Sequence, residues 1–217
     1  MLKGIFLRTL SRKRTQKIIN YIYTMSIPTK TLFDFIASTI KLSKKDQKAI
    51  EHHLSVENYH KYDLIVKQGQ VCDTLRFVVS GVYRVYRIED GKEITSYFNY
   101  ESRNPFVASF VSLLTQTPSV EIVECIIPGT LLSISYSDWT SLYDTSPSLN
   151  TFGRRMAEYN YILAMERIES LQFQTATNRY NAFIKLYPSL LNMIPHHYIA
   201  SYLGITPESL SRIRKEI

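Results

Sequence analysis

The stretch Ile199–Lys215 decides how the C-terminal part of this chain folds, and it reads Ile-Ala-Ser-Tyr-Leu-Gly-Ile-Thr-Pro-Glu-Ser-Leu-Ser-Arg-Ile-Arg-Lys. Gly204 supplies the positive φ that ends one helix and turns the chain toward the next. Ala200 is small enough to let two helices approach each other. Leu210 and Ile213 lie three residues apart and give the second helix an apolar face. The spacing of these four residues predicts a helix-turn-helix.

The second helix of this motif has a clear start and a free outer face. Thr206 is a good N-cap residue, and Pro207 suits the first helical position. Arginine can grip a guanine through two hydrogen bonds, glutamate can accept from a cytosine amine, and serine and lysine suit phosphates. The structural alternative is an ordinary αα-hairpin with a solvated polar face. The residues expected to contact DNA are Thr206, Glu208, Ser209, Ser211, Arg212 and Lys215.

The same stretch resembles the C-terminal DNA-binding segment of the Crp/Fnr family of bacterial transcription regulators. The base-reading glutamate and arginine of that family match Glu208 and Arg212, whereas a further family arginine falls at Pro207. The family usually adds a β-hairpin wing after this helix; the sequence ends at Ile217, so we expect no wing. The resemblance implies a homodimeric regulator that binds a double-stranded DNA operator, with RNA polymerase as a further partner.

Upstream, from Tyr62 onward, the apolar pattern changes to a period of two, which is typical of strands. Asp90-Gly91 between two alternating runs is a strong hairpin signal. Short strands with regular turns predict an antiparallel barrel or jelly roll. The whole of 58–137 resembles the cyclic-nucleotide-binding β-roll of Crp/Fnr proteins. We therefore expect an α+β fold: an antiparallel, jelly-roll-like β-roll, a long dimerisation helix and a C-terminal helix-turn-helix domain.

The nucleotide pocket of that family is altered in this chain. Family members hold the ligand with a Gly-Glu helix and an Arg-Ser/Thr pair, but the corresponding stretch 104–111 contains neither Gly nor Glu. Ser119 and Val120 stand where the pair would fall, and Glu121 would repel a phosphate. We expect no cyclic AMP in the family manner, and leave open another small-molecule effector or a purely structural shell. The candidate lining residues are Tyr97, Phe98, Phe106, Ser109, Phe110, Ser119 and Glu121.

A long helix is expected to begin at Ser146-Pro147 and to run to about Asn178. Its apolar residues step by three and four, which is a heptad seam. A single helix packed on its own roll is the alternative, but a helix-turn-helix protein that reads two half-sites needs two-fold symmetry. The expected seam consists of Leu149, Phe152, Met156, Tyr159 and Leu163.

The positive charge of the chain is concentrated at its start. Residues 1–24 hold six basic side chains and no acidic one, so the remainder carries 20 of the 26 basic residues and all 19 acidic ones. This segment is either a membrane-surface or nucleic-acid arm, or lies upstream of a true start at Met25. The expected divisions are a basic extension (1–24), a β-roll sensor (25–145), a dimerisation helix (146–178) and a helix-turn-helix domain (179–217).

Other functional classes find little support. No run of eighteen apolar residues predicts a membrane helix, and two cysteines make neither a disulfide framework nor a metal cluster, which favours a cytoplasmic protein. No nucleophile elbow or Gly-rich phosphate loop is present, so we expect no catalytic residues, no bound metal and no cofactor. The rival hypothesis is a small-molecule sensor that acts through protein partners and carries a vestigial helix-turn-helix.

Overall fold

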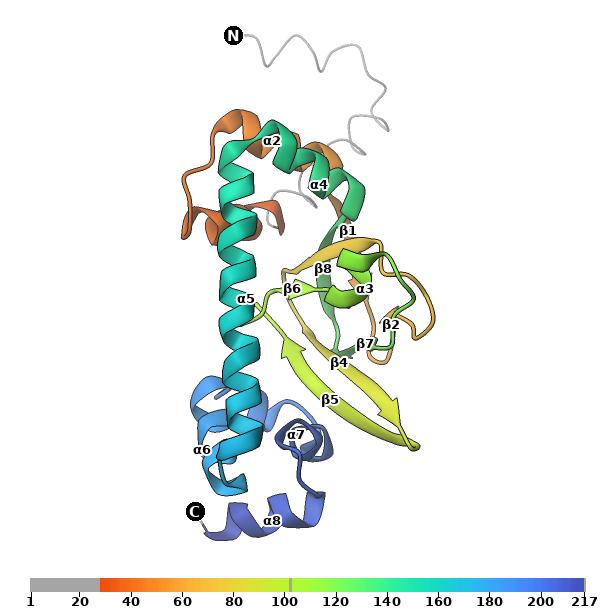
Figure 1. Ribbon diagram of the computed structural model, residues 1–217, viewed down its shortest axis with the longest axis vertical. Coiled ribbons are helices and arrows are strands. Elements are labelled where there is room, and N and C mark those ends of the chain that lie inside the picture. The colour runs from red at the N-terminus through yellow and green to blue at the C-terminus, as the bar shows by residue number, and fades with distance from the viewer. Residues whose placement is uncertain (1–27, 102, 217) are drawn as a thin grey trace, which may run out of the picture.

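The computed structural model describes residues 28–101 and 103–216, which form the expected α+β structure (Figure 1). Helix α5 (Pro147–Phe173) runs along the long axis, with the strands on one side of it and the last three helices at its lower end. The basic segment 1–24 and the expected start at Met25 lie outside the described residues.

The strands make two four-stranded antiparallel sheets, in the orders β1-β8-β3-β6 and β2-β7-β4-β5. Consecutive strands β7 and β8 belong to different sheets, so the chain crosses between the two layers and forms a roll. The β-roll expected from the sequence is confirmed. The strands are β1 (Ser55–Tyr59), β2 (Leu64–Val66), β3 (Thr74–Val78), β4 (Val82–Glu89), β5 (Lys92–Asn99), β6 (Phe106–Val107), β7 (Ile122–Ile127) and β8 (Gly129–Ser135).

Glycines set two of the turns in this roll. Between β4 and β5, Asp90 and Gly91 have φ of 50° and 73°, the two positive values that a tight hairpin turn needs, so the predicted hairpin is confirmed. Gly81 and Gly129 pass so close that a Cβ on either would collide with the backbone of the other. This contact fixes where β4 and β8 begin.

The helical residues 28–37 pack on the first sheet, and α2 (Lys44–His53) lies beside α4 at the top of the molecule (Figure 1). A capping box starts α2: Ser43 accepts a hydrogen bond from the amide of Asp46 at 3.1 Å and donates one to its carboxylate at 2.6 Å. Phe35 reaches the sheet and lies 5.6 Å from the ring of Phe77.

Two further caps define the bounds of the long helix. Ser146 ends α4 (Tyr136–Thr145) and also caps α5, where it accepts from the amide of Leu149 at 3.3 Å. At the other end Thr175 accepts from the amide of Asn178 at 3.2 Å and starts a new helix, α6 (Ala176–Leu186). The expectation that one helix runs to Asn178 is therefore wrong, because the Thr175 cap interrupts it.

The chain buries two hydrophobic clusters. The first lies in the roll and includes Leu149 and Phe152 at the start of α5. The second joins the outer face of the second sheet, at Val82 and Phe98, to the C-terminal helices. These helices are α6, the 3-10 turn Leu190–Asn192, α7 (His196–Leu203) and α8 (Pro207–Glu216). The C-terminal helices are thus packed against the roll as well as against α5.

Candidate nucleic-acid interface and effector region

Helices α7 and α8 form the helix-turn-helix that the sequence predicts. Gly204 ends α7 with φ of 66°. Ala200, Leu210 and Ile213 are buried, with exposed fractions of 1%, 1% and 6%. Thr206 accepts from the amide of Ser209 at 3.2 Å and so caps α8. Each residue that defined the motif occupies its expected place.

The outer face of α8 is accessible at the lower end of the molecule (Figure 1). Glu208, Ser211, Arg212 and Lys215 are exposed, and Ser209 is half-buried beside the cap. These polar side chains share the helix with a buried apolar face, which leaves them free for an external partner. Thr206 differs in role, since its hydroxyl is used for capping.

A buried arginine joins this motif to the roll. Arg84 of β4 is only 1% exposed, and its guanidinium lies between the rings of Tyr86 and Tyr198, at 3.9 Å and 3.7 Å from their centroids. It also pairs with Glu93 at 2.6 Å and Glu124 at 2.9 Å. Such stacking is strongest where the cation is removed from water. Through Tyr198, this contact attaches the first turn of α7 to the second sheet of the roll.

A serine on α7 strengthens the same contact. Ser201 accepts from the amide of Thr95 at 2.9 Å and donates to the carbonyl of Glu93 at 2.8 Å. It therefore takes the place of a neighbouring strand along part of β5. The orientation of α7, and of α8 behind it, is fixed by the second sheet.

The lower half of α5 holds the motif from the other side. Arg167 donates to the carbonyl of Tyr202 and stacks on its ring at 4.0 Å. Burial lowers the pKa of Arg167. Arg179 of α6 donates to the carbonyl of Leu203 at 2.9 Å. Two cations thus satisfy carbonyls at the C-terminal end of α7, where a helix favours positive charge.

In the roll, four of the predicted effector residues lie in one buried region. Ser109 donates to the carboxylate of Glu121 at 2.7 Å, and Ser119 donates to the carbonyl of Glu121 at 2.8 Å. The hydroxyl of Tyr97 donates to the carbonyl of Ala108 at 3.3 Å. Glu121 is 8% exposed. A carboxylate and internal hydrogen bonds occupy the stretch that would have to receive a phosphate.

The other three predicted pocket residues lie elsewhere. Phe98 alternates with Tyr97 along β5 and faces outward, where it packs on Phe183 at 6.4 Å and Tyr202 at 5.6 Å. Its assignment to the effector pocket is wrong, because neighbouring strand residues point to opposite faces. Phe106 and Phe110 line a different hollow, between α3 (Phe110–Thr115), α4 and α5.

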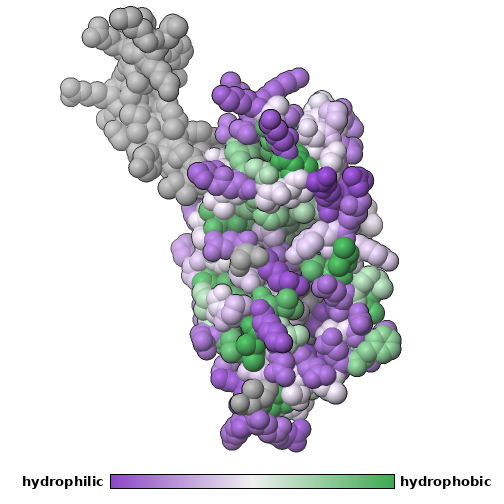
Figure 2. Space-filling view, turned by 90° about the vertical axis from the view of Figure 1, so that its left-hand side faces the viewer, coloured by the Kyte–Doolittle hydropathy of each residue, from purple (hydrophilic) through white to green (hydrophobic). Residues whose placement is uncertain are grey.

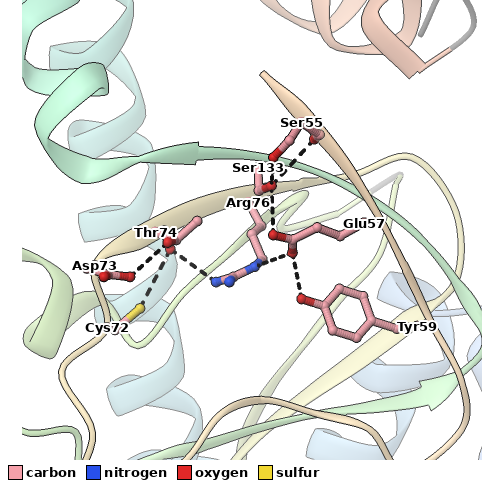
Figure 3. Close-up of polar contacts among 8 residues, drawn as sticks. All are labelled: Ser55, Glu57, Tyr59, Cys72, Asp73, Thr74, Arg76 and Ser133. Atoms are coloured by element: carbon pink, nitrogen blue, oxygen red, sulfur yellow. Dashed lines mark hydrogen bonds and ion pairs between the residues drawn. The ribbon is translucent and has the colours of Figure 1, made fainter. Parts of the chain in front are cut away.

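A polar cluster of the roll contains an arginine whose charge is already neutralised by Glu57 (Figure 3). Glu57 accepts from Tyr59 at 2.6 Å, from Nε of Arg76 at 2.8 Å and from Ser133 at 2.9 Å. The ring of Tyr59 meets Tyr83 of the second sheet at 6.3 Å, which places the cluster between the sheets. Because the carboxylate of Glu57 already accepts these three hydrogen bonds, the cluster is a structural network.

Protonation in this network follows the same contacts. Burial would raise the pKa of Glu57, but the hydrogen bonds from Tyr59 and Arg76 outweigh it and hold that pKa below its ordinary value. Burial, together with the hydrogen bond to Glu57, raises the pKa of Tyr59 to about 12. At neutral pH the cluster therefore carries one balanced ion pair.

The predicted dimer seam is divided by the structure. Leu149 and Phe152 are 0% and 1% exposed within this single chain, so they cannot form the surface between two chains. The ring of Phe152 contacts Phe106 at 6.2 Å and Trp139 at 6.4 Å. Their assignment to the seam is corrected: the start of α5 completes the core of its own roll. Met156 and Leu163 are half-buried, and Tyr159 is 39% exposed.

A second apolar stripe on α5 remains uncovered. Its residues are spaced by four, three, four and three, which is a heptad register displaced by two positions from that of the expected seam. Tyr161, Ile168 and Leu171 are 68%, 46% and 46% exposed. The face of the molecule drawn in Figure 2 is mostly hydrophilic, with apolar groups scattered over it. We call this set the α5 stripe: Ala157, Tyr161, Ala164, Ile168 and Leu171.

The sequence contained a signal for the α5 stripe, since its spacing is as regular as that of the expected seam. The seam was placed on the first apolar residues of the helix, which the roll uses instead. The contacts of Arg84 and Arg167 left no comparable signal, because each joins segments far apart in the chain. No helix of the described part is long and apolar enough to cross a membrane. Within the same residues, no three metal-ligating side chains gather to hold an ion.

Comparisons with known proteins agree with this architecture. Residues 56–146 match the family model of the cyclic nucleotide-binding domain. FixK2 from Bradyrhizobium japonicum has a similar structure, with a TM-score of 0.66 and 18% identity over 75% of this chain and 83% of that one. A putative transcriptional regulator of the crp/fnr family from Eubacterium rectale also has a similar structure. Its TM-score is 0.63 and its sequence identity 21%, over 81% of this chain and 83% of that one.

A third similar structure is CLP from Xanthomonas campestris, described as a c-di-GMP responsive global regulator. Its TM-score is 0.61 at 18% identity, over 80% of this chain and 91% of that one. No curated protein sequence matches the chain. The chain therefore has the fold of the Crp/Fnr regulators, a cyclic nucleotide-binding-type roll followed by a long helix and a helix-turn-helix.

Proposed function

We propose that this protein is a homodimeric, DNA-binding transcription regulator of the Crp/Fnr type that works in the cytoplasm and catalyses no reaction. The observation that carries the proposal is the exposure of Glu208, Arg212 and Lys215 on the outer face of α8. The inner face of the same helix is packed into the protein through Leu210 and Ile213. Recognition helices of this class place such residues in the major groove. The fold shared with Crp/Fnr regulators supports the same function, and RNA polymerase is the partner through which it would act.

The proposal is tested by selecting a preferred operator from random duplexes and then comparing three alanine variants. We expect Arg212→Ala to lose about 1–3 kcal/mol of binding free energy and to relax the preference at one base position in each half-site. Lys215→Ala should weaken all duplexes similarly and lower the slope of log affinity against log salt by about one. Arg154→Ala, which removes a remote exposed cation, is the control and should bind like wild type.

The rival function, a sensor that acts through protein partners with a vestigial helix-turn-helix, makes the opposite prediction. It requires that no duplex be enriched and that Arg212→Ala and Lys215→Ala match wild type. The capped start of α8 and its buried inner face favour a helix still built for use. The binding comparison decides between the two functions.

The second subunit is proposed to bind along the α5 stripe. An apolar heptad of exposed residues on a 27-residue helix is suited to pairing with its own copy about a two-fold axis. Two copies of α8 would then read two half-sites one helical turn apart, about 34–36 Å. This dimer replaces the one expected from Leu149 and Phe152.

The roll is proposed not to bind cyclic AMP. A buried phosphate needs a cation and hydrogen-bond donors, but this region holds the carboxylate of Glu121 and the hydroxyls of Ser109 and Ser119. Losing one charge-assisted partner costs about 2–5 kcal/mol, or roughly 30- to 4000-fold in affinity. Calorimetry should detect no saturable binding below about millimolar ligand. Ser119→Arg combined with Glu121→Ala should raise the affinity; micromolar binding by the unmodified protein would contradict this account.

A further inference from the structure

A cavity of about 380 Å³ opens between α3, α4 and the first half of α5. Seven of its fourteen lining residues are aromatic, and none is charged. Its floor is formed by residues of the protomer core, among them Leu113, Trp139 and Phe152 at 2%, 6% and 1% exposed. The volume lies in the range of small-molecule sites, which are mostly apolar with a few polar groups. The cavity lies outside the buried region of Ser109 and Glu121.

The polar groups of this cavity are few. Trp139 donates to the hydroxyl of Tyr143 at 2.6 Å, so the indole nitrogen is already used. The half-buried amide of Asn160 lines the cavity and makes no hydrogen bond with any other described residue. Gly153 forms part of the wall because a Cβ there would strike the ring of Tyr143. The site therefore offers aromatic walls, the free amide of Asn160 and the hydroxyls of three lining tyrosines, Tyr136, Tyr143 and Tyr161.

We propose that this cavity binds an uncharged small molecule with an aromatic or aliphatic body and a single hydrogen-bonding end, which meets Asn160. The absence of a lining cation disfavours a carboxylate or phosphate ligand, because either would lose its hydration without compensation. Ala157 and Tyr161 line the cavity and also belong to the α5 stripe. The ligand would thus touch the surface proposed for the second subunit; this regulatory step rests on the proposed function.

The neutral fluorophore N-phenyl-1-naphthylamine tests the binding. Trp139 is the only tryptophan of the chain, so excitation through the indole reports proximity of the probe to this cavity in the wild-type protein. We expect saturable emission with about one probe per protomer, and energy transfer from Trp139, because the cavity holds a single ligand-sized space. A stoichiometry that falls as the dimer forms would overturn the proposal, because a second copy would then fill the cavity.

Two matched variants on α3 localise the probe. Leu114 lines the cavity and Val111 does not, yet both are exposed, at 64% and 61%, so a bulky side chain at either should be tolerated by the fold. With direct excitation of the probe, we expect Leu114→Trp to weaken binding by about tenfold or more and Val111→Trp to change it by about twofold at most. Equal affinities in both variants, or no saturable emission in wild type, would overturn the proposal.

The same samples test ligand binding in the cavity and operator binding separately. Probe binding is measured without DNA, so its failure refutes the cavity whether or not an operator is bound. Operator affinity is measured with and without saturating probe, and we expect a change in wild type that Leu114→Trp suppresses. A protein that binds the probe but no duplex would contradict the proposed function instead.

Discussion

The two halves of α5 carry equally regular apolar patterns but lie in opposite environments. In the first half Leu149 and Phe152 are fully buried by the roll. In the second half Ile168 and Leu171 are nearly half exposed, and the contact with the rest of the chain runs through Arg167 and Tyr202. The helix is thus held by apolar packing at one end and by a stacked, hydrogen-bonded cation at the other.

This difference shows that heptad spacing identifies a surface to be covered and leaves the covering partner open. The roll, α4 and Phe35 cover the first half, where Phe35 meets Phe152 at 6.3 Å. The second half runs down to α6 and α7 (Figure 1), and its apolar residues Ile168 and Leu171 are exposed in the single chain. The apolar surface left for another subunit therefore lies mostly on the second half.

The largest effect on stability should come from removing a buried side chain in the first half of α5. Phe152→Ala removes a ring buried at 1% exposure and should lower the free energy of unfolding by about 3–5 kcal/mol. Tyr159→Ala changes a residue of the same predicted seam that is 39% exposed and should cost about 1 kcal/mol. Urea unfolding of both variants measures the difference. Equal losses would show that the seam is not divided into a buried and an exposed part.

An intermediate effect is expected at the α5 stripe. Ile168→Asp places a charge in the proposed interface and should raise the dimer dissociation constant by at least about 30-fold, or about 2 kcal/mol, while leaving the protomer folded. Sedimentation and circular dichroism measure the two quantities. Ile162→Asp is the matched control, because Ile162 is 54% exposed but lies roughly 120° around the helix. A wild-type protein that is monomeric at micromolar concentration would refute the seam.

The smallest effect concerns the polar attachment of the second half. Arg167→Met keeps an apolar stem but loses the stacking on Tyr202 and the hydrogen bond to its carbonyl, so we expect a loss of about 1–3 kcal/mol in stability. Arg154→Met removes an exposed pair with Glu158 on the same helix and should change stability by about 0.5 kcal/mol or less. Thermal unfolding compares the two variants. If Arg167→Met leaves the stability unchanged, apolar packing alone holds α7 in place.

Local patterns predicted the helix-turn-helix and the β4–β5 hairpin correctly. Gly204, Thr206 and the Asp90-Gly91 turn act through their own backbone conformations and through neighbours a few residues away. Because the stabilising contacts are short in sequence, the residues themselves were enough to place these elements.

The effector region could be predicted only in part. The sequence assigned Ser109 and Glu121 to one predicted pocket, and the structure joins them by a hydrogen bond of 2.7 Å. It misplaced Phe98, which the C-terminal helices bury on the opposite face of β5. The apolar cavity beside α5 could not be predicted from the sequence, because its walls come from α3, α4 and α5 and no single run of residues forms it.

By itself the sequence determined the helix-turn-helix, the alternating strands of the roll and the β4–β5 turn, where α8 begins, and that Ser119 and Glu121 supply no cation for a phosphate. Only the tertiary structure decided which apolar faces remain available. Leu149 and Ile168 are both apolar residues on the same helix, but the roll excludes water from one and leaves the other exposed. Burial depends on what lies across from a side chain, and on α5 that is decided by segments more than a hundred residues upstream, such as Phe35 against Phe152.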